Sequence, residues 1–202
     1  MTYIESNGAI KAVLAKEALI GFDADSMFNP NFSLEGTPIS TLRREMGVAK
    51  IPRVVEHLRY LLDIVEAPKI VVMANHHEVM DALAEQLGPT YGVKVHRGGM
   101  TTDAKDKAKL DFISGNDRIF VLQLATAAGI DGLQQVANYA VFAEPDWTPG
   151  NNEQCVDRLH RIGQHDNVVA QFIVAEGSFD EKILHAVIGK AKVTHEVLDK
   201  RF

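Results

Sequence analysis

The chain has 202 residues, of which 46% are hydrophobic and 24% are charged, and its formal net charge is −6. This length and composition indicate one folded domain, or one domain with an appendage, and exclude a membrane-spanning segment because no apolar run is long enough. The acidic balance excludes a globally basic surface, so any contact with nucleic acid must be local. No basic start followed by an apolar core opens the chain, and we expect a cytoplasmic, nucleoid-associated or nuclear protein.

The first 68 residues differ in pattern from the rest of the chain. Residues 22–38 are rich in Asp, Asn, Pro, Ser and Gly, which favours an irregular connection or a disordered stretch. Helical periodicity then runs from Ile51 to Val65, and we interpret this stretch as a brace joined to the core. We therefore expect an N-terminal helical and irregular extension.

From Lys69 onward, short β-branched apolar runs alternate with segments of helical spacing. Strands are expected at residues 69–74, 93–97, 118–124, 139–144 and 168–175. Helices are expected at residues 76–87, 101–115, 151–162 and 179–202, the last with Ser178 as its cap. Turn residues stand at 88–89, 98–99, 115–116 and 149–152. This alternation predicts an α/β fold with a mostly parallel sheet flanked by helices, and functional residues in loops beyond the carboxyl ends of its strands.

The segment QCVDRLHRIGQ, from Gln154 to Gln164, carries two arginines three residues apart. On the predicted helix Arg158 and Arg161 share one face. Two planar, permanently charged guanidinium groups can grip phosphate oxygens, as phosphoryl transfer requires. An exposed helix with two solvated arginines is the alternative. We expect Cys155, the only cysteine, to serve packing rather than nucleophilic chemistry.

Two further segments precede the arginines and suit phosphate contacts. Arg97 and Gly98 close a predicted strand, and the small residues there let backbone amides approach a phosphate. The stretch LQLATAAGIDGLQ leaves the next strand through Thr126 and Gly129 and reaches Asp131. The Thr126 hydroxyl has an alternative role, which is to satisfy a polar group of its own turn.

In this order, and with the flanking VFAEPDWTPGNNEQ, these segments closely resemble the second RecA-like lobe of Swi/Snf-type DNA translocases in helicase superfamily two. The resemblance extends from about Lys50 to Val193 and is nearest to the fork-remodelling, strand-annealing branch, through VFAEPDWTPG, DRLHRIGQ and FIVAEGSFDEKI. It implies a three-layer RecA-like domain. Residues 50–202 would form the helicase C-terminal lobe with its C-terminal helix, and residues 1–49 an N-terminal extension or inter-lobe linker.

The resemblance also implies roles for residues near the nucleotide. Arg158 and Arg161 match the arginines that reach the γ-phosphate of ATP, with Arg161 as the arginine finger. Gln154 would lie near the nucleotide or tie the helix to a neighbouring loop. Gly129 and Asp131 would belong to the nucleotide side, although Swi/Snf members more often carry asparagine at the position of Asp131.

On the nucleic-acid side, the resemblance assigns DNA-backbone contacts to Arg97, Gly98 and Thr126, with Gly129 in the same loop. Contacts to phosphates predict binding without sequence preference and with marked salt sensitivity. No metal site is predicted, because His76 and His77 are adjacent, diverge, and have no carboxylate or cysteine pattern beside them.

Neither a glycine-rich phosphate loop ending in Lys-Ser/Thr nor a DExH-like acidic motif occurs in the sequence. We therefore expect ATP and Mg²⁺ to bind only together with a first RecA-like lobe, supplied in cis or in trans, and the isolated chain not to hydrolyse ATP. The expected partner is double-stranded or forked DNA, and no membrane. The alternative is a free-standing DNA- or protein-binding module without catalysis. A dinucleotide enzyme is disfavoured because no GxGxxG follows a predicted strand.

Overall fold

The computed structural model describes residues 2–18, 33–34, 37–146, 148–182 and 184–185. Most of the stretch expected to be irregular, residues 22–38, and most of the expected C-terminal helix lie outside these residues. Where the chain is described in the first stretch, β2 (Ser33–Leu34) pairs antiparallel with β3 (Thr37–Pro38). The start of the last helix is described, and the Ser178 hydroxyl accepts the Glu181 amide at 3.3 Å, which confirms Ser178 as its cap.

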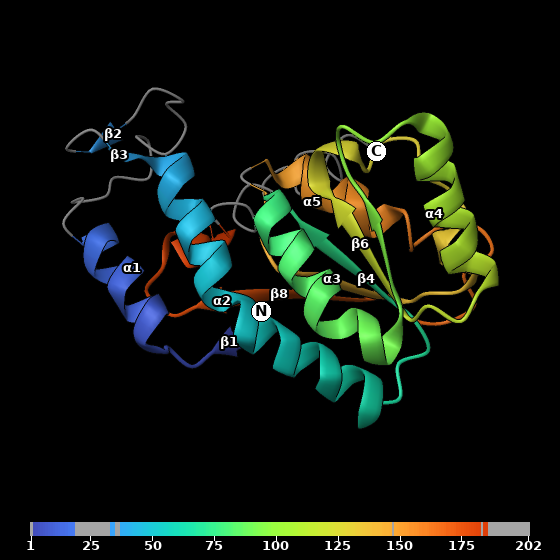
Figure 1. Ribbon diagram of the computed structural model, residues 1–202, viewed down its shortest axis with the longest axis horizontal. Coiled ribbons are helices and arrows are strands. Elements are labelled where there is room, and N and C mark those ends of the chain that lie inside the picture. The colour runs from blue at the N-terminus through green and yellow to red at the C-terminus, as the bar shows by residue number, and fades with distance from the viewer. Residues whose placement is uncertain (1, 19–32, 35–36, 147, 183, 186–202) are drawn as a thin grey trace, which may run out of the picture.

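A six-stranded sheet forms the centre of the molecule (Figure 1). Its strand order is β1-β8-β7-β4-β6-β5, and every neighbouring pair is parallel. The strands are β1 (Thr2–Ile4), β4 (Ile70–Ala74), β5 (Val93–His96), β6 (Ile119–Gln123), β7 (Tyr139–Phe142) and β8 (Val169–Ala175). The five strands expected from Lys69 onward are confirmed, whereas β1 was not predicted.

The central strands are apolar on both sides because helices cover both faces of the sheet. All five residues of β4 are buried, and successive side chains point to opposite faces. Ile70 and Val72 pack in one hydrophobic cluster, whereas Val71 and Met73 pack in the other. A continuous apolar run in the sequence thus becomes the boundary between two cores.

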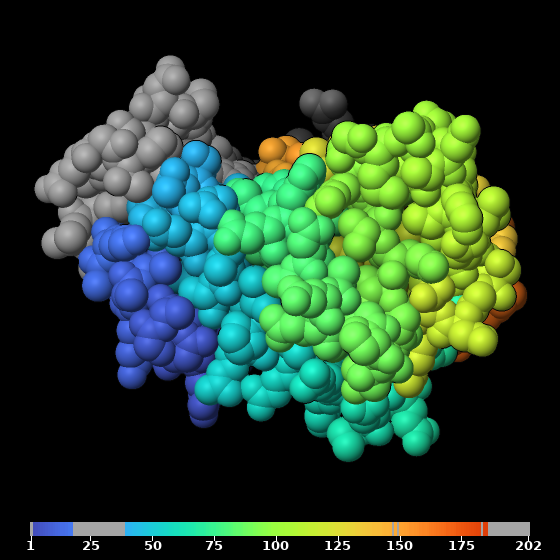
Figure 2. All heavy atoms as spheres, in the orientation of Figure 1, coloured from blue at the N-terminus to red at the C-terminus, as the bar shows by residue number. Residues whose placement is uncertain are grey.

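The helices form the two outer layers. They are α1 (Gly8–Ala18), α2 (Ile39–Asp63), α3 (His77–Tyr91), α4 (Thr102–Ser114) and α5 (Pro149–Asp157), with short 3₁₀ turns η2 (Leu124–Thr126) and η3 (Leu133–Gln135). Residues of α2 and α3 share a core with one sheet face, and residues of α4 and α5 share a core with the other. Figure 2 shows α1, α2 and α3 forming a continuous outer surface beside α4. The predicted three-layer α/β fold is confirmed.

Two predicted turns lie inside helices. Gly88 and Pro89 belong to the last turns of α3, which ends at Tyr91 and is followed by Gly92 with a positive φ of 67°. A proline there removes only one late hydrogen bond, so the helix continues past it. Residues 149–152 form the first turn of α5, where Pro149 occupies a position whose missing N–H has no intrahelical partner to lose.

The N-terminal residues are connected closely to the sheet and to α2. β1 pairs with β8 as the sixth strand, and α1 packs along α2. The expected division between residues 49 and 50 falls inside α2, which runs without interruption from Ile39 to Asp63. In the described part of the chain, none of the helices combines the length and apolar character needed to cross a membrane.

Candidate functional site

The loops that carry the candidate residues meet at one edge of the sheet. Because all six strands are parallel, the segments after β4, β5, β6 and β7 leave the sheet at its carboxyl edge. Arg97 follows β5, Thr126 and Asp131 follow β6, and α5 follows β7. The topology therefore brings all three predicted phosphate-binding segments to the same side of the molecule.

The arginine segment is not a continuous helix. α5 ends at Asp157, with Arg158 as its C-cap, so the prediction that Arg158 and Arg161 share a helical face is wrong. After the helix, hydrogen bonds join residues three apart in place of four, such as the bond from the Leu159 amide to the Val156 carbonyl at 2.9 Å. A second turn follows, in which Gly163 has φ 98°, a conformation that glycine adopts most readily. That glycine was the sequence signal for a helix end.

Arg161 and Asp131 form an ion pair across the two loops. Nη1 of Arg161 donates to Oδ1 of Asp131 at 3.1 Å, and the side chains are 49% and 62% exposed. The hydrogen bond from Gln134 lowers the pKa of Asp131, and the amide of Gly132 and the charges of Arg161 and Arg158 lower it further. The structure thus brings Arg158, Arg161 and Asp131 together.

Arg158 has an unusual buried donor. Its Nε is buried and has no hydrogen-bond partner in the described part of the chain. Buried donors normally have partners, so this one suits an acceptor brought by a ligand or a second domain. Gln154 lies exposed on α5, and Gly129 lies exposed in its loop with φ 84°. No side-chain hydrogen bond ties Gln154 to a neighbouring loop among the described residues, and its predicted place near the nucleotide stays a prediction.

The turn after Arg158 is held by two hydrogen bonds of Gln164 and exposes an apolar side chain. The Gln164 amide bonds to the Arg161 carbonyl at 3.0 Å, and its side chain donates to the Ala137 carbonyl at 2.9 Å. Ile162, at the tip, is 97% exposed. A groove of about 440 Å³ runs beside it, lined by His160, Arg161, Ile162, Gln164 and Asp166.

The predicted DNA-facing residues are close together but already have partners. Nη1 of Arg97 donates to Oδ1 of Asp81 on α3 at 2.6 Å. The Gly98 amide donates to Oε1 of Gln123 at 2.7 Å, so it does not point freely toward solvent. The Thr126 hydroxyl donates to the Gln123 carbonyl at 2.9 Å, which is the alternative, turn-satisfying role.

His96 lies behind these loops. Its Nδ1 lies 3.2 Å from the Thr126 hydroxyl. Burial lowers the pKa of His96, and the nearby charge of Lys105 adds to the effect, so the ring is neutral near pH 7. We therefore assign His96 to holding Thr126 in place, not to binding phosphate with a positive charge.

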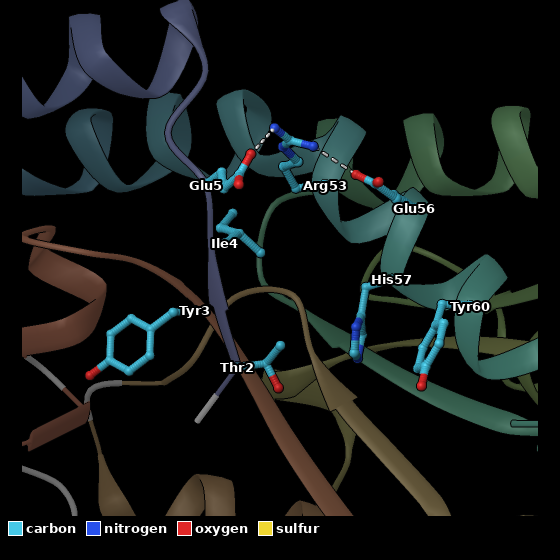
Figure 3. A pocket seen from close by; sticks show the side chains of 8 residues that line it. All are labelled: Thr2, Tyr3, Ile4, Glu5, Arg53, Glu56, His57 and Tyr60. Atoms are coloured by element: carbon cyan, nitrogen blue, oxygen red, sulfur yellow. Dashed lines mark hydrogen bonds and ion pairs between the residues drawn. The ribbon is translucent and has the colours of Figure 1, made fainter. Parts of the chain in front are cut away.

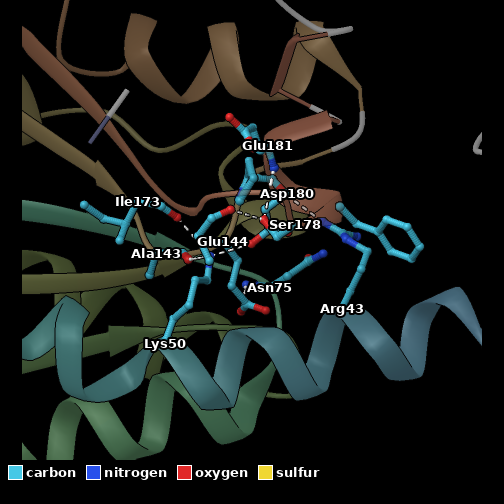
Figure 4. A network of polar contacts seen from close by, with 12 residues as sticks. Arg43, Lys50, Asn75, Ala143, Glu144, Ile173, Ser178, Asp180 and Glu181 are labelled. Carbon is cyan, nitrogen blue, oxygen red and sulfur yellow. Dashed lines mark hydrogen bonds and ion pairs between the residues drawn. The ribbon is translucent and has the colours of Figure 1, made fainter. Parts of the chain in front are cut away.

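A buried polar network, which no sequence motif indicated, fastens α2 to the loops after β7 and β8 (Figure 4). Lys50 is fully buried, and its Nζ donates to the carbonyls of Ala143 and Ile173 at 2.7 and 2.9 Å. It also forms an ion pair with Asp180 at 2.5 Å. Arg43, about two helical turns before Lys50 on α2, donates to the Pro145 carbonyl at 2.6 Å. The loop that leads into α5 is thereby fixed.

Glu144 extends this network to the loop after β4. Its carboxylate accepts the amides of Asn75 and His76 at 2.8 and 3.0 Å and Nδ1 of His76 at 2.5 Å. Burial alone would raise the pKa of Glu144, but the bonds from His76 and Asn75 hold it below its usual value. Gly47 lets α2 approach closely, since a Cβ there would lie 2.4 Å from Oε1 of Glu144.

Two other features are structural. Cys155 is buried in the core under α5, and burial raises the pKa of its thiol to about 12, so it is not a nucleophile. Within the described ranges, no group of three or more His, Cys, Asp and Glu side chains could hold a metal ion. Away from the carboxyl edge, a hollow of about 320 Å³ lies between β1 and α2, with Arg53 bridging Glu5 and Glu56 at its rim (Figure 3).

Comparison with known families and proteins adds to this geometry. Residues 53–163, more than half of the chain, match the family described as the helicase conserved C-terminal domain. The SWI/SNF-related matrix-associated actin-dependent regulator of chromatin subfamily A-like protein 1 of Bos taurus is 32% identical over 150 residues, which cover 73% of this chain and 16% of that protein. Its homolog in Caenorhabditis elegans is 30% identical over 154 residues, covering 75% and 22%.

DNA repair protein RAD5 of Candida glabrata is 32% identical over 165 residues, which cover 76% of this chain and 14% of that protein. The chain therefore spans between 14% and 22% of the length of these three relatives. Among solved structures, the C-terminal part of the Fun30 ATPase domain superposes with a TM-score of 0.61 at 18% identity, covering 87% of this chain and 64% of that one. This likeness shows the fold.

Proposed function

We propose that this chain supplies the arginine finger and the DNA-backbone contacts of an ATP-dependent double-stranded DNA translocase. The proposal starts from its family: the chain belongs to the helicase conserved C-terminal domain family, as a second RecA-like lobe of Swi/Snf type near the fork-remodelling branch. The single observation that carries this proposal is the convergence of Arg158, Arg161 and Asp131 at the carboxyl edge. Its relatives are named for chromatin regulation and DNA repair, which supports a nuclear or nucleoid-associated place for this chain.

Arg161 is suited to exchange its carboxylate partner for a phosphate. Its pair with Asp131 is exposed, and exposed ion pairs are weak because water screens both charges. A γ-phosphate oxygen offers the same charge and accepts the same forked hydrogen bonds. The buried Nε of Arg158, which has no hydrogen-bond partner among the described residues, fits a second phosphate contact or a contact to the neighbouring lobe. Gln154 and Gly129 remain in the proposal as neighbours of the nucleotide.

A first lobe is needed to complete the nucleotide site. The sequence contains no glycine-rich phosphate loop, and the described residues contain no acidic cluster for Mg²⁺, so both functions belong to the partner lobe. ATP and Mg²⁺, when bound there, supply the transferable phosphoryl group and neutralise its charge. Ile162 supports such a partner, because an apolar side chain 97% exposed beside Arg161 suits burial in a closed cleft.

The DNA contacts proposed for this lobe depend mainly on Arg97. The Gly98 amide is bonded to Gln123, so Gly98 would act by having no side chain, which lets DNA approach the backbone closely. Thr126 would act by stabilising the turn that follows β6. A guanidinium that grips a backbone phosphate predicts binding to duplex or forked DNA without sequence preference. Residues 1–49 are proposed either as an N-terminal extension of this lobe or as a linker between the two lobes.

The arginine-finger role is tested in the motor reassembled from this chain and a first RecA-like lobe. We expect Arg161→Ala to lower ATP turnover by about a thousandfold, because charge on the transferring phosphoryl group loses its stabilisation. The affinity for duplex DNA is expected to change by less than about twofold, since Arg161 makes no DNA contact in the proposal. Arg59→Ala, on the exposed side of α2, is the matched control. Unchanged turnover in Arg161→Ala would favour a binding module without catalysis.

A further inference from the structure

One side chain joins the ends of three neighbouring strands at the carboxyl edge. Gln123 is the last residue of β6, which lies between β4 and β5 in the sheet. Its Oε1 accepts the Gly98 amide after β5 at 2.7 Å, and its Nε2 donates to the Asn75 carbonyl after β4 at 3.1 Å. Its own carbonyl accepts the Thr126 hydroxyl at 2.9 Å. Gln123 therefore contacts both loops that carry predicted DNA-facing residues, and the loop after β4.

The orientation of this amide is determined by its partners. An N–H group must face the oxygen of the amide, and a carbonyl must face its nitrogen, so only one of the two flipped forms satisfies both. Neither an aliphatic nor an acidic side chain reproduces both bonds. Gly98 is also fitted to this contact, because a Cβ at that position would lie 3.2 Å from Oε1 of Gln123.

We propose that Gln123 is a positioning residue for DNA binding, whose side chain holds the Arg97–Gly98 backbone so that the Arg97 guanidinium meets a DNA phosphate. This inference rests on the DNA contact proposed above for Arg97. With the backbone fixed by Gln123, only the Arg97 side chain has to leave Asp81, 2.6 Å away, when a phosphate arrives. Without that fixed backbone, Arg97 keeps its charge, but its guanidinium is no longer positioned to contact the phosphate.

The effect of the Gln123 side chain is separable from that of Thr126. Thr126 bonds to the backbone carbonyl of residue 123, which any substitution retains, and to His96. Substitution of the Gln123 side chain therefore releases the Arg97–Gly98 loop and leaves the turn of Thr126 in place. We therefore expect Gln123 variants to lose affinity for DNA because Arg97 is no longer held in position.

The experiment is a double-mutant cycle on the affinity for a 20-base-pair duplex of arbitrary sequence, measured with this chain at several salt concentrations. The variants are Gln123→Met, Arg97→Ala and the two combined. Methionine keeps the length of glutamine and makes neither hydrogen bond, so packing is preserved. Gln135→Met, an exposed glutamine in η3, is the control.

We expect Arg97→Ala to weaken binding by about tenfold at low salt and to reduce the slope of log Kd against log salt by about one. Gln123→Met is expected to weaken binding several-fold in the same direction. The double variant should bind no more weakly, within about twofold, than Arg97→Ala alone, because both changes remove one contact. Gln135→Met should bind like the wild-type chain. Hydrogen exchange should show a protected Gly98 amide in the wild-type chain and an unprotected one in Gln123→Met.

The possible failures are distinguishable. If Arg97→Ala binds like the wild type, the proposed DNA contact is wrong and this inference falls with it. If Arg97→Ala weakens binding but Gln123→Met does not, only the positioning role is wrong. Fully additive losses in the double variant would mean that Gln123 acts through general stability, which also overturns the inference.

Discussion

Two ion pairs of this lobe each join a basic side chain to an aspartate, one in the core and one at the surface. Lys50 and Asp180 meet at 2.5 Å with side chains 0% and 5% exposed, and Lys50 also donates to two backbone carbonyls. Arg161 and Asp131 meet at 3.1 Å with side chains 49% and 62% exposed. The buried pair cannot exchange partners without leaving a charge in the core, whereas water or an anion can replace either member of the exposed pair.

The buried and the exposed ion pairs have different roles in this account. The buried network around Lys50 fixes the loop between β7 and α5, which carries the arginine segment. The exposed pairs, Arg161 with Asp131 and Arg97 with Asp81, hold the two proposed phosphate contacts in reach of a ligand. The buried network thus holds the loops in place, while each arginine can exchange its carboxylate partner for a phosphate, as preorganised binding of phosphates requires.

The largest expected effect is on the buried pair. Lys50→Ala should lower the free energy of unfolding by about 3 to 5 kcal/mol, because Asp180 and two carbonyls lose their shared donor in the core. Urea denaturation measures this change, with Lys107→Ala on the exposed face of α4 as the control. A loss below about 1 kcal/mol would contradict the distinction between the two pairs.

A second effect concerns Glu17, whose carboxylate lies next to the buried pair. Burial raises the pKa of Glu17 from 4.5 to about 7, while Oε2 accepts the Phe179 amide at 3.0 Å and Oε1 has no partner in the described part of the chain. The folded state therefore binds a proton that the unfolded state releases above about pH 4.5. Stability from this group is complete below that pH and is lost as pH rises through 7, by roughly 3 kcal/mol in all.

Glu17→Gln should remove most of this pH dependence. We expect the variant to be more stable than the wild type at pH 8 and to differ little at pH 4, in urea denaturation at a series of pH values. Glu85→Gln, on the exposed side of α3, should retain the wild-type profile. An unchanged pH profile in Glu17→Gln would show that the carboxyl ionises normally in the folded protein.

The smallest expected effect is on an exposed pair. Asp81→Asn should leave the denaturation midpoint unchanged within error, because exposed ion pairs contribute little to folding. It should strengthen duplex DNA binding about two- to fivefold at low salt, since Arg97 loses a competitor and the surface loses a negative charge. Glu85→Gln removes a charge on the same helix without freeing Arg97. An equal gain in DNA affinity in both variants would mean that the change in net charge, and not the release of Arg97, strengthens binding.

The parts of the fold that depend on local pattern could be predicted. The central strands are continuous apolar runs because both faces are covered, and Ser178 is a cap because a hydroxyl precedes a helix. The end of α5 could not be placed, because the spacing of Arg158 and Arg161 fits both a helix and the two turns that follow it. The Gly163 signal competed with helical periodicity and was the better guide.

The supporting residues of the site were beyond sequence reasoning for a physical reason. Lys50 bonds to groups 93, 123 and 130 residues away, and nothing in its local sequence distinguishes it from an exposed lysine. Gln123 likewise bonds to groups 25 and 48 residues away, whose proximity depends on the strand order. Motifs pointed to the residues that we propose to face a ligand, whereas the contacts of Lys50 and Gln123 became visible only in the fold.

The most direct test of the second-lobe account is ATP hydrolysis by this chain alone and after addition of a first RecA-like lobe, each with and without duplex DNA. The account predicts no DNA-stimulated turnover by the chain alone and robust, DNA-stimulated turnover in the reassembled motor, since the phosphate loop and the Mg²⁺ ligands come from the partner. Robust turnover by the chain alone, abolished by Arg161→Ala, would contradict the account, because this lobe would then contain a complete phosphate site of its own.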